Sequence, residues 1–301
     1  MKKILFAICI FIFGTFLPLE ILSEEKYTPY KDSETVEVEE FIDLINKEYR
    51  KSPEEILSDP YMAKYINDFI DWTNYLNALD LPEKTSDRTP KDLIKVYPDI
   101  PTKAALELLP CMISWDESKG NQLIEAGNKS LEISPNWFAY QCRGLGNYYL
   151  GKNIEAIKDL KKSLEMMPKY YLPVAAETFN YMALSKYELK EYKDAITDVN
   201  GAIAASALIK DPKGRYFHNR GLFLYMASDE EPKYKVARLK QARKDFSNAI
   251  KLKSIVRPNS YYLRAMTNYQ LNKNDKKIIC DDLFKAEQLG IENDFSKSFC
   301  E

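Results

Sequence analysis

The sequence contains a single histidine and only ten glycines among its 301 residues. A lone histidine excludes a metal site built from several imidazoles. The shortage of glycine leaves few left-handed turn positions, which favours helices joined by short turns over a many-stranded sheet. C-x-x-C, H-E-x-x-H and G-x-S-x-G motifs and glycine-rich phosphate loops are also missing. Zinc knuckles, thioredoxin-like redox sites and the common hydrolase and nucleotide motifs are therefore not expected, and no metal or cofactor is predicted.

Charge of one sign is also lacking, because 43 Lys and Arg residues stand against 45 Asp and Glu residues and give a formal net charge of −2. This balance is too even to predict a nucleic-acid partner or an anionic-membrane surface. The lysine-rich run Lys233–Lys244 is interpreted as a solvated helix face.

The one long apolar run lies at the N-terminus. Two lysines precede the run Ile4–Phe13, and Ser23 offers a small residue ahead of an acidic pair. This layout predicts a secretory signal peptide over residues 1–23, and hence a periplasmic or secreted protein without a transmembrane segment in its mature chain. The alternative is a retained anchor, which the shortness of the run, together with Gly14 and Pro18, makes the weaker interpretation.

Cleavage of that peptide would remove Cys9 and leave an even number of cysteines, which permits two disulfides in three connectivities. Cys280 and Cys300 fall on consecutive helices of the expected C-terminal cap, and we predict that they pair and staple that end of the chain. Cys111 and Cys142 fall on neighbouring helices, and their pairing is left open.

An internal repeat is visible in the second half of the chain. Each copy begins with a predicted helix that carries a small residue, and a tyrosine follows four residues later. The small residues are Gly144, Ala183, Gly221 and Ala265, and the tyrosines are Tyr148, Tyr187, Tyr225 and Tyr269. Positions three and four apart share one helix face, so small residues there allow a partner helix to approach closely.

A second predicted helix follows in each copy. It carries an aspartate before an apolar residue, and a small residue comes four positions after the aspartate. The aspartates are Asp159, Asp198, Asp245 and Asp282, and the small residues are Ser163, Ala202, Ala249 and Ala286. One such hairpin cannot bury its own apolar stripe, so it is expected to stack on the next.

This pattern resembles the tetratricopeptide repeat family, whose unit is about 34 residues. The resemblance implies an all-α, right-handed superhelical solenoid of helix hairpins over residues 101–301, closed by a capping helix within 291–300. Residues 24–100 are expected to form an N-terminal helical extension. An insertion is expected around 228–234. A degenerate first copy is expected over 104–131, with Pro110 kinking its first helix.

An arginine precedes the small residue in three of these copies, at Arg143, Arg220 and Arg264, whereas the remaining copy has Met182. Because the arginine recurs together with the aspartate of the second helix, we predict structural ion pairs rather than a catalytic site. The predicted partners are Asp159, Asp198, Asp245 and Asp282.

The same resemblance implies that the first helices line a concave groove for a partner. The implied groove positions lie three residues before and one residue after each small residue. They are Gln141, Leu145, Asn180, Leu184, His218, Leu222, Tyr262 and Met266. For His218, a pH-sensing or ligand contact and a tolerated polar position stay open. The recurring tyrosines could edge this surface or serve in packing.

These observations predict a non-catalytic scaffold or adaptor of the cell envelope that binds a protein or peptide in the groove. Two alternatives stay open. One is a cell-wall hydrolase on a helical solenoid that uses a lone glutamate, and the other is a periplasmic protein that binds a small ligand.

Overall fold

The structure is a computed structural model of the chain. It describes residues 95–113, 117–168, 171–208, 212–292 and 294–300, together with positions 74 and 79. The predicted signal peptide and nearly all of the predicted helical extension lie outside these residues. Within the described ranges all regular structure is helical, as predicted, and helices that follow one another in sequence pack in adjacent pairs.

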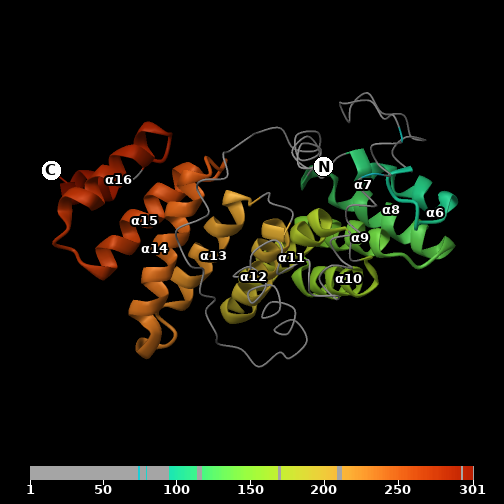
Figure 1. Cartoon of the computed structure of the whole chain (residues 1–301), viewed down its shortest axis with the longest axis horizontal. Helices are drawn as coiled ribbons and strands as arrows, with labels where there is room; N and C mark the ends of the chain where they lie inside the picture. Colours follow the sequence, from blue (N-terminus) through green and yellow to red (C-terminus); the bar gives the residue numbers. More distant parts are fainter. Residues whose placement is uncertain are drawn as a thin grey trace. The chain divides into compact units, whose positions relative to one another are not determined.

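The described α-helices lie in the C-terminal two-thirds of the chain, between Thr102 and Cys300 (Figure 1). They are α6 (Thr102–Glu107), α7 (Leu109–Ile113), α8 (Gly120–Ile133), α9 (Trp137–Tyr149), α10 (Asn153–Met166), α11 (Leu172–Glu188), α12 (Tyr192–Leu208), α13 (Gly214–Ala227), α14 (Lys235–Lys251), α15 (Arg257–Leu271), α16 (Lys276–Gln288) and α17 (Asp294–Cys300). The chain divides into two compact units, and among the described residues the division falls inside α11, between Tyr181 and Met182.

In the first unit, α9 packs against both α8 and α10. The helix begins where Asn136 caps it, because the Asn136 side chain accepts a hydrogen bond from the Ala139 amide at 2.8 Å. Gly144 faces α10 so closely that a Cβ there would lie 2.8 Å from Leu160 Cγ. A side chain at this position would therefore push the two helices apart, which explains the small residue.

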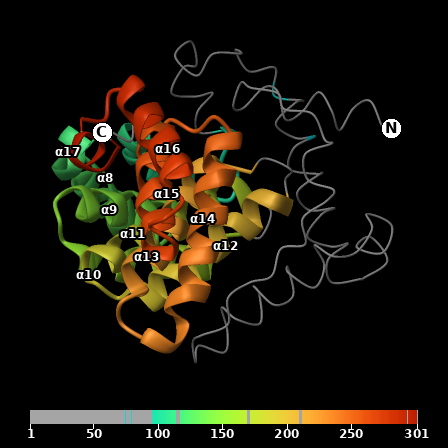
Figure 2. The same ribbon diagram turned by 90° about the vertical axis from the view of Figure 1, so that its left-hand side faces the viewer.

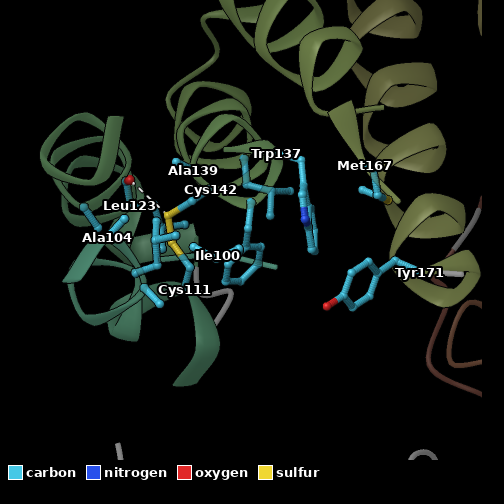
Figure 3. Close-up of a cluster of buried hydrophobic side chains, with 14 residues drawn as sticks. Ile100, Ala104, Cys111, Leu123, Trp137, Ala139, Cys142, Met167 and Tyr171 are labelled. Atoms are coloured by element: carbon cyan, nitrogen blue, oxygen red, sulfur yellow. Dashed lines mark hydrogen bonds between the residues drawn. A yellow bond between two sulfur atoms is a disulfide. The ribbon is translucent and has the colours of Figure 1, made fainter. Parts of the chain in front are cut away.

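An aromatic cluster of this unit holds Trp137 and Tyr171 next to each other (Figure 3), with ring centroids 4.6 Å apart. Both side chains hydrogen-bond to Asp99, with Trp137 Nε1 donating to Oδ2 at 2.6 Å and the Tyr171 hydroxyl donating to Oδ1 at 2.7 Å. Tyr97 stacks on Phe138 with ring centroids 4.6 Å apart. Residues 95–100 therefore pack onto α9 and are continuous with the core of the first repeats.

In the second unit, α12 packs on α13, and α13 to α16 form successive neighbours. They follow one another across the view of Figure 1 and lie one behind another in the turned view of Figure 2. Gly221 allows the same close approach of two helices as Gly144 does in the first unit, because a Cβ at Gly221 would lie 2.8 Å from the Phe246 ring. Ala265 is fully buried against α16 in a cluster with Ile279 and Leu283. The spacing of small residues in the sequence thus marks real helix contacts.

The first, degenerate copy is interrupted as predicted. α6 ends at Glu107, and α7 begins at Leu109, so Pro110 lies in the first turn of a new helix, where its missing N–H costs nothing. The second helix of this copy is α8, which spans Gly120–Ile133 and so ends two residues beyond the predicted end of the copy at 131.

Several helices end on a residue in the left-handed conformation, so that the last carbonyls are capped by backbone amides. At the end of α9 this residue is Gly151, with φ of 70°. At the end of α14 it is Lys253, with φ of 51°, and its amide donates to the Ile250 carbonyl at 3.0 Å. Lysine rather than glycine therefore holds a strained turn between α14 and α15.

The predicted insertion lies between α13 and α14 and is held by a side chain that the sequence did not single out. Arg238, inside the run interpreted as a solvated face, has 0% relative exposure. Its Nη1 donates to the Ala227 carbonyl at 2.6 Å and its Nη2 to Glu231 at 3.2 Å. That interpretation is therefore wrong for Arg238, since its guanidinium anchors the inserted loop to α13.

Two cysteine pairs lie at disulfide distance. Cys280 and Cys300 join α16 to α17 with Cα atoms 5.7 Å apart, and Cys111 and Cys142 join α7 to α9 with Cα atoms 5.9 Å apart (Figure 3). None of the described helices is both long and apolar enough to cross a bilayer.

Candidate interaction surface on the first helices

In three of the four copies the recurring arginine forms an ion pair with the second helix of its own hairpin. Arg220 on α13 donates to Asp245 on α14 through two bonds, from Nε at 2.7 Å and from Nη2 at 2.6 Å. Both side chains are nearly inaccessible to solvent, at 4% and 0% exposure. Such a two-pronged pair fixes the angle between the helices as well as their distance.

The same geometry recurs in two further hairpins. Arg143 holds Asp159 with bonds of 2.7 and 2.8 Å, and Arg264 holds Asp282 with bonds of 2.8 and 2.7 Å. These two pairs are closer to solvent than the pair in α13 and α14. Neighbouring Asp159 raises the pKa of Arg143, chiefly through their hydrogen bond, so this guanidinium stays charged.

Each arginine also reaches the second helix of the preceding copy with its third nitrogen, Nη1. The acceptors lie 3.0, 2.9 and 3.0 Å from the Nη1 atoms of Arg143, Arg220 and Arg264, and they are Asn128, Asn200 and Ser247, respectively. One guanidinium therefore joins three helices. We call this arrangement, arginine with its aspartate and its preceding-helix acceptor, the arginine clamp.

The copy formed by α11 and α12 lacks the clamp. Met182 occupies the arginine position, and Asp198 is paired instead with Lys186, whose Nζ lies 2.8 Å from Oδ2. That oxygen has no hydrogen bond of good geometry within the described part of the chain, so the contact is mainly electrostatic. Burial raises the pKa of Asp198 to about 7, despite the opposing effect of Lys186.

The polar positions assigned to the groove do not face it where their contacts are visible. Gln141 on α9 is buried, and its Nε2 donates to the Thr178 hydroxyl on α11 at 2.8 Å. Thr178 in turn donates to the Val174 carbonyl of its own helix at 2.8 Å. Gln141 therefore links two successive first helices and is not available to a ligand, which corrects the groove prediction for this residue.

His218 makes the equivalent link between α13 and α15. Its Nδ1 lies 2.8 Å from the Ser260 hydroxyl, and that hydroxyl donates to the Val256 carbonyl at 3.0 Å. The serine proton is thus already used, so Nδ1 carries the proton shared with Ser260. Burial lowers the pKa of His218 to about 4, and the ring is neutral near pH 7. A ligand contact or a pH-sensing role near neutrality is therefore wrong for His218.

Two other groove predictions are also corrected by burial. Asn180 and Leu145 are buried at 3% and 1% exposure, and Leu145 belongs to the core cluster of the first unit. Their burial removes both side chains from any docking surface.

The remaining groove positions are half-buried. They are Leu184, Leu222, Tyr262 and Met266. Met226 lies one turn beyond Leu222 on α13 and is exposed, so these two apolar side chains share one face of that helix. The candidate interaction surface is therefore narrower and more apolar than the sequence predicted.

Two of the recurring tyrosines both pack between helices and lie at the edge of the candidate interaction surface. Tyr187 stacks on Phe223 with centroids 5.1 Å apart, whereas the Tyr225 hydroxyl accepts a bond from Gln270 Nε2 at 2.8 Å. Burial raises the pKa of both hydroxyls. They serve packing between successive first helices while staying partly open to solvent.

Sequence reasoning missed the aromatic residue three positions before each clamp arginine. The guanidinium of each arginine lies 5.5 to 5.7 Å from the ring centroid. The rings belong to Tyr140, Phe217 and Tyr261. The signal was present, since position 179 in the copy without the arginine is also aromatic. The acceptors of the preceding helix left no such signal, because their residue types differ.

No cluster of His, Cys, Asp and Glu side chains in the described ranges could hold a metal ion. Comparison of the chain with protein-family models and with characterised proteins gives no match.

Proposed function

We propose that this chain is an exported, non-catalytic scaffold of the tetratricopeptide type, which binds a protein or an extended peptide along its first helices. The proposal includes the right-handed superhelical path of the hairpins and the concave face that such a path creates. The signal peptide and a periplasmic or secreted location are also parts of it.

The arginine clamp is the observation that carries this proposal. Because the same guanidinium joins its own second helix and the preceding one in three hairpins, those hairpins are held to their predecessors in the same way. Repetition of one relation between neighbours is what builds a helical repeat protein, and such proteins present extended surfaces to their partners.

The half-buried apolar row supports a peptide or helix as the ligand. Leu184, Leu222 and Met266 stand at the same position of three successive first helices. Apolar side chains that are partly covered supply anchors for a partner at little cost in desolvation. The two cysteine pairs at disulfide distance support an oxidising compartment, as expected outside the cytoplasm.

Site-specific photo-crosslinking in the native cell tests this function. A photoreactive residue is placed singly at 184, 222 and 266, and a matched control is placed at 161, an exposed lysine on α10. The proposal expects one discrete protein adduct from the first-helix positions and none from the control.

Different results would contradict the scaffold function and favour the hydrolase or the small-ligand receptor. Adducts that appear equally at all positions, or at none, contradict the scaffold. Cell-wall turnover by the purified protein, without any adduct, would instead identify the hydrolase. A thermal shift with a metabolite, again without an adduct, would identify a small-ligand receptor.

A further inference from the structure

We propose that the outer face of α14, together with the turn formed by residues 252–256, binds the surface of a membrane that carries anionic phospholipids. This basic face is separate from the first-helix surface, and the proposal does not depend on the identity of the protein partner.

The exposed charged side chains of α14 are all positive, because its one aspartate and one of its arginines are buried and paired inside the fold. Asp245 is the only acidic residue between Lys233 and Lys253, and it is buried against Arg220. The buried Arg238 is likewise satisfied inside the fold. The surface of this stretch is therefore positive, although the whole chain is nearly neutral.

The basic side chains converge on one face of the helix. Lys240, Arg243 and Lys251 are exposed on α14 and follow one another at intervals of three and eight residues, which places them within about 60° of a common line along the axis. Val236 is exposed on the same face, at 57%. The face is thus a basic strip with apolar content, as found on helices that lie on membranes.

The turn at the end of the strip presents an isoleucine to solvent. Ile255 is 90% exposed, the most exposed of the large apolar side chains in the described part of the chain. Lys251, Lys253 and Arg257 surround it in the sequence. An isolated aliphatic tip ringed by cations can enter the boundary between headgroups and acyl chains while the lysines stay with the phosphates.

The turn is held firmly enough to act as such a tip. Behind it, a Cβ on Gly214 would lie 2.6 Å from Ser254 Cβ, so the turn packs directly on the start of α13. The Ser254 amide donates to Ala249 at 3.3 Å, and the Arg257 amide donates to Ser254 at 2.9 Å. Ile255 is therefore displayed by a braced turn.

An acidic protein segment would fit the cations but not this isoleucine. A segment that pairs with lysines has no use for a solitary, fully projecting aliphatic side chain, because such a side chain gains only when it leaves water. A lipid surface takes both features at once. The second helix α10 shows the contrast, since its exposed Lys162 is paired with Glu165 at 3.1 Å and acids are interspersed along it.

The experiment reads lipid contact at single residues, so that binding by any other part of the chain does not confuse it. A photo-crosslinker is placed in the full chain at 255 or, as the matched control, at 154, where the native isoleucine is 69% exposed on α10. The protein is illuminated with phosphatidylcholine vesicles that contain or lack phosphatidylglycerol. We expect lipid adducts at 255 only, and only with phosphatidylglycerol.

Charge variants give the second readout. Each lysine or arginine near an anionic surface contributes about a fivefold gain in binding, so the triple variant K240Q/R243Q/K251Q should reduce the adduct at 255 by about a hundredfold. The control triple K158Q/K161Q/K162Q on α10 should leave it unchanged. High salt should act as the first triple does, because the charges are exposed.

Three results would overturn the proposal. The first is a lipid adduct at 154 equal to that at 255, and the second is an adduct at 255 that ignores lipid charge. The third is the absence of any lipid adduct at 255. If poly-glutamate then binds the wild type and not the first triple variant, the strip is assigned to an acidic protein. Circular dichroism of each variant checks that the helices are intact.

Discussion

Replacing Asp198 with Asn is expected to stabilise the folded protein at pH 8 and to change little near pH 4. Asp198 is almost fully buried on α12, and it faces Lys186 where other copies place an arginine. Burial is the largest influence on this carboxyl, and the acids Asp194 and Glu191 add to it, so the pKa of Asp198 rises from 3.8 to about 7. The folded state therefore holds the proton more tightly than the unfolded chain does.

The sign and size of the effect follow from this difference. The contribution of a carboxyl with a raised pKa is complete below about pH 4, and it is lost as the pH rises from 4 to 7. The gap between 3.8 and about 7 corresponds to about 4 kcal/mol at most. The Asp198→Asn substitution removes the stability loss that the folded protein suffers above pH 4, but it leaves Lys186 without a carboxylate partner. Since the lysine side chain is 19% exposed, it can turn to water, and a net gain of about 1 to 4 kcal/mol is expected at pH 8.

Urea unfolding of the oxidised protein, followed by circular dichroism between pH 4 and pH 8, measures this gain. The wild type and Asp198→Asn should have similar midpoints at pH 4 and should separate steadily up to pH 7. Asp159→Asn is the matched control, because Asp159 has its arginine, and this substitution should lower rather than raise stability at pH 8. The reasoning fails if the midpoints of Asp198→Asn and wild type keep a constant separation, or if they diverge toward acid.

Three further outcomes are expected from the same unfolding assay. Arg220→Ala should cost about 3–5 kcal/mol, because it strands a buried carboxylate, whereas Arg143→Ala should cost less, since 28% of its side chain is exposed; equal losses would contradict the role of burial. Replacing Cys280 and Cys300 with Ser should lower stability by about 3 kcal/mol and speed hydrogen exchange in α17 first; unchanged exchange there would count against the staple. Burial lowers the pKa of His218 to about 4, so the free energy of unfolding of the wild type should fall by about 3 kcal/mol between pH 6.5 and pH 4. His218→Gln should remove this decrease. A wild-type stability that does not change in this pH range would disprove the role of His218.

The packing of each hairpin could be predicted from the sequence because its contacts join residue types that recur. Gly144 and Gly221 lie against Leu160 and Phe246, and small residues opposite large ones at helical spacing leave a periodic trace. Charged pairs between two helices of one hairpin leave a similar trace, since both partners repeat together.

Contacts between successive copies could not be predicted in the same way, because their partners vary. Gln141 bonds to a threonine and His218 bonds to a serine, although both occupy the same position of their helices. The same is true of the clamp acceptors. Sequence alone therefore points such a polar side chain toward the groove of an idealised repeat, whereas in the structure Gln141 and His218 are buried and bond to the next first helix.

The variable contacts also determine where a partner can bind. The polar position three residues before the small residue links neighbouring first helices where its bonds are visible. The position after the small residue carries a half-buried apolar side chain in three copies. Recognition along this surface must then depend on shape and on Leu184, Leu222 and Met266 more than on buried hydrogen-bonding groups. A surface of that kind selects a partner by the spacing of its apolar anchors, and the fixed angle imposed by each clamp is what would keep that spacing constant from one hairpin to the next.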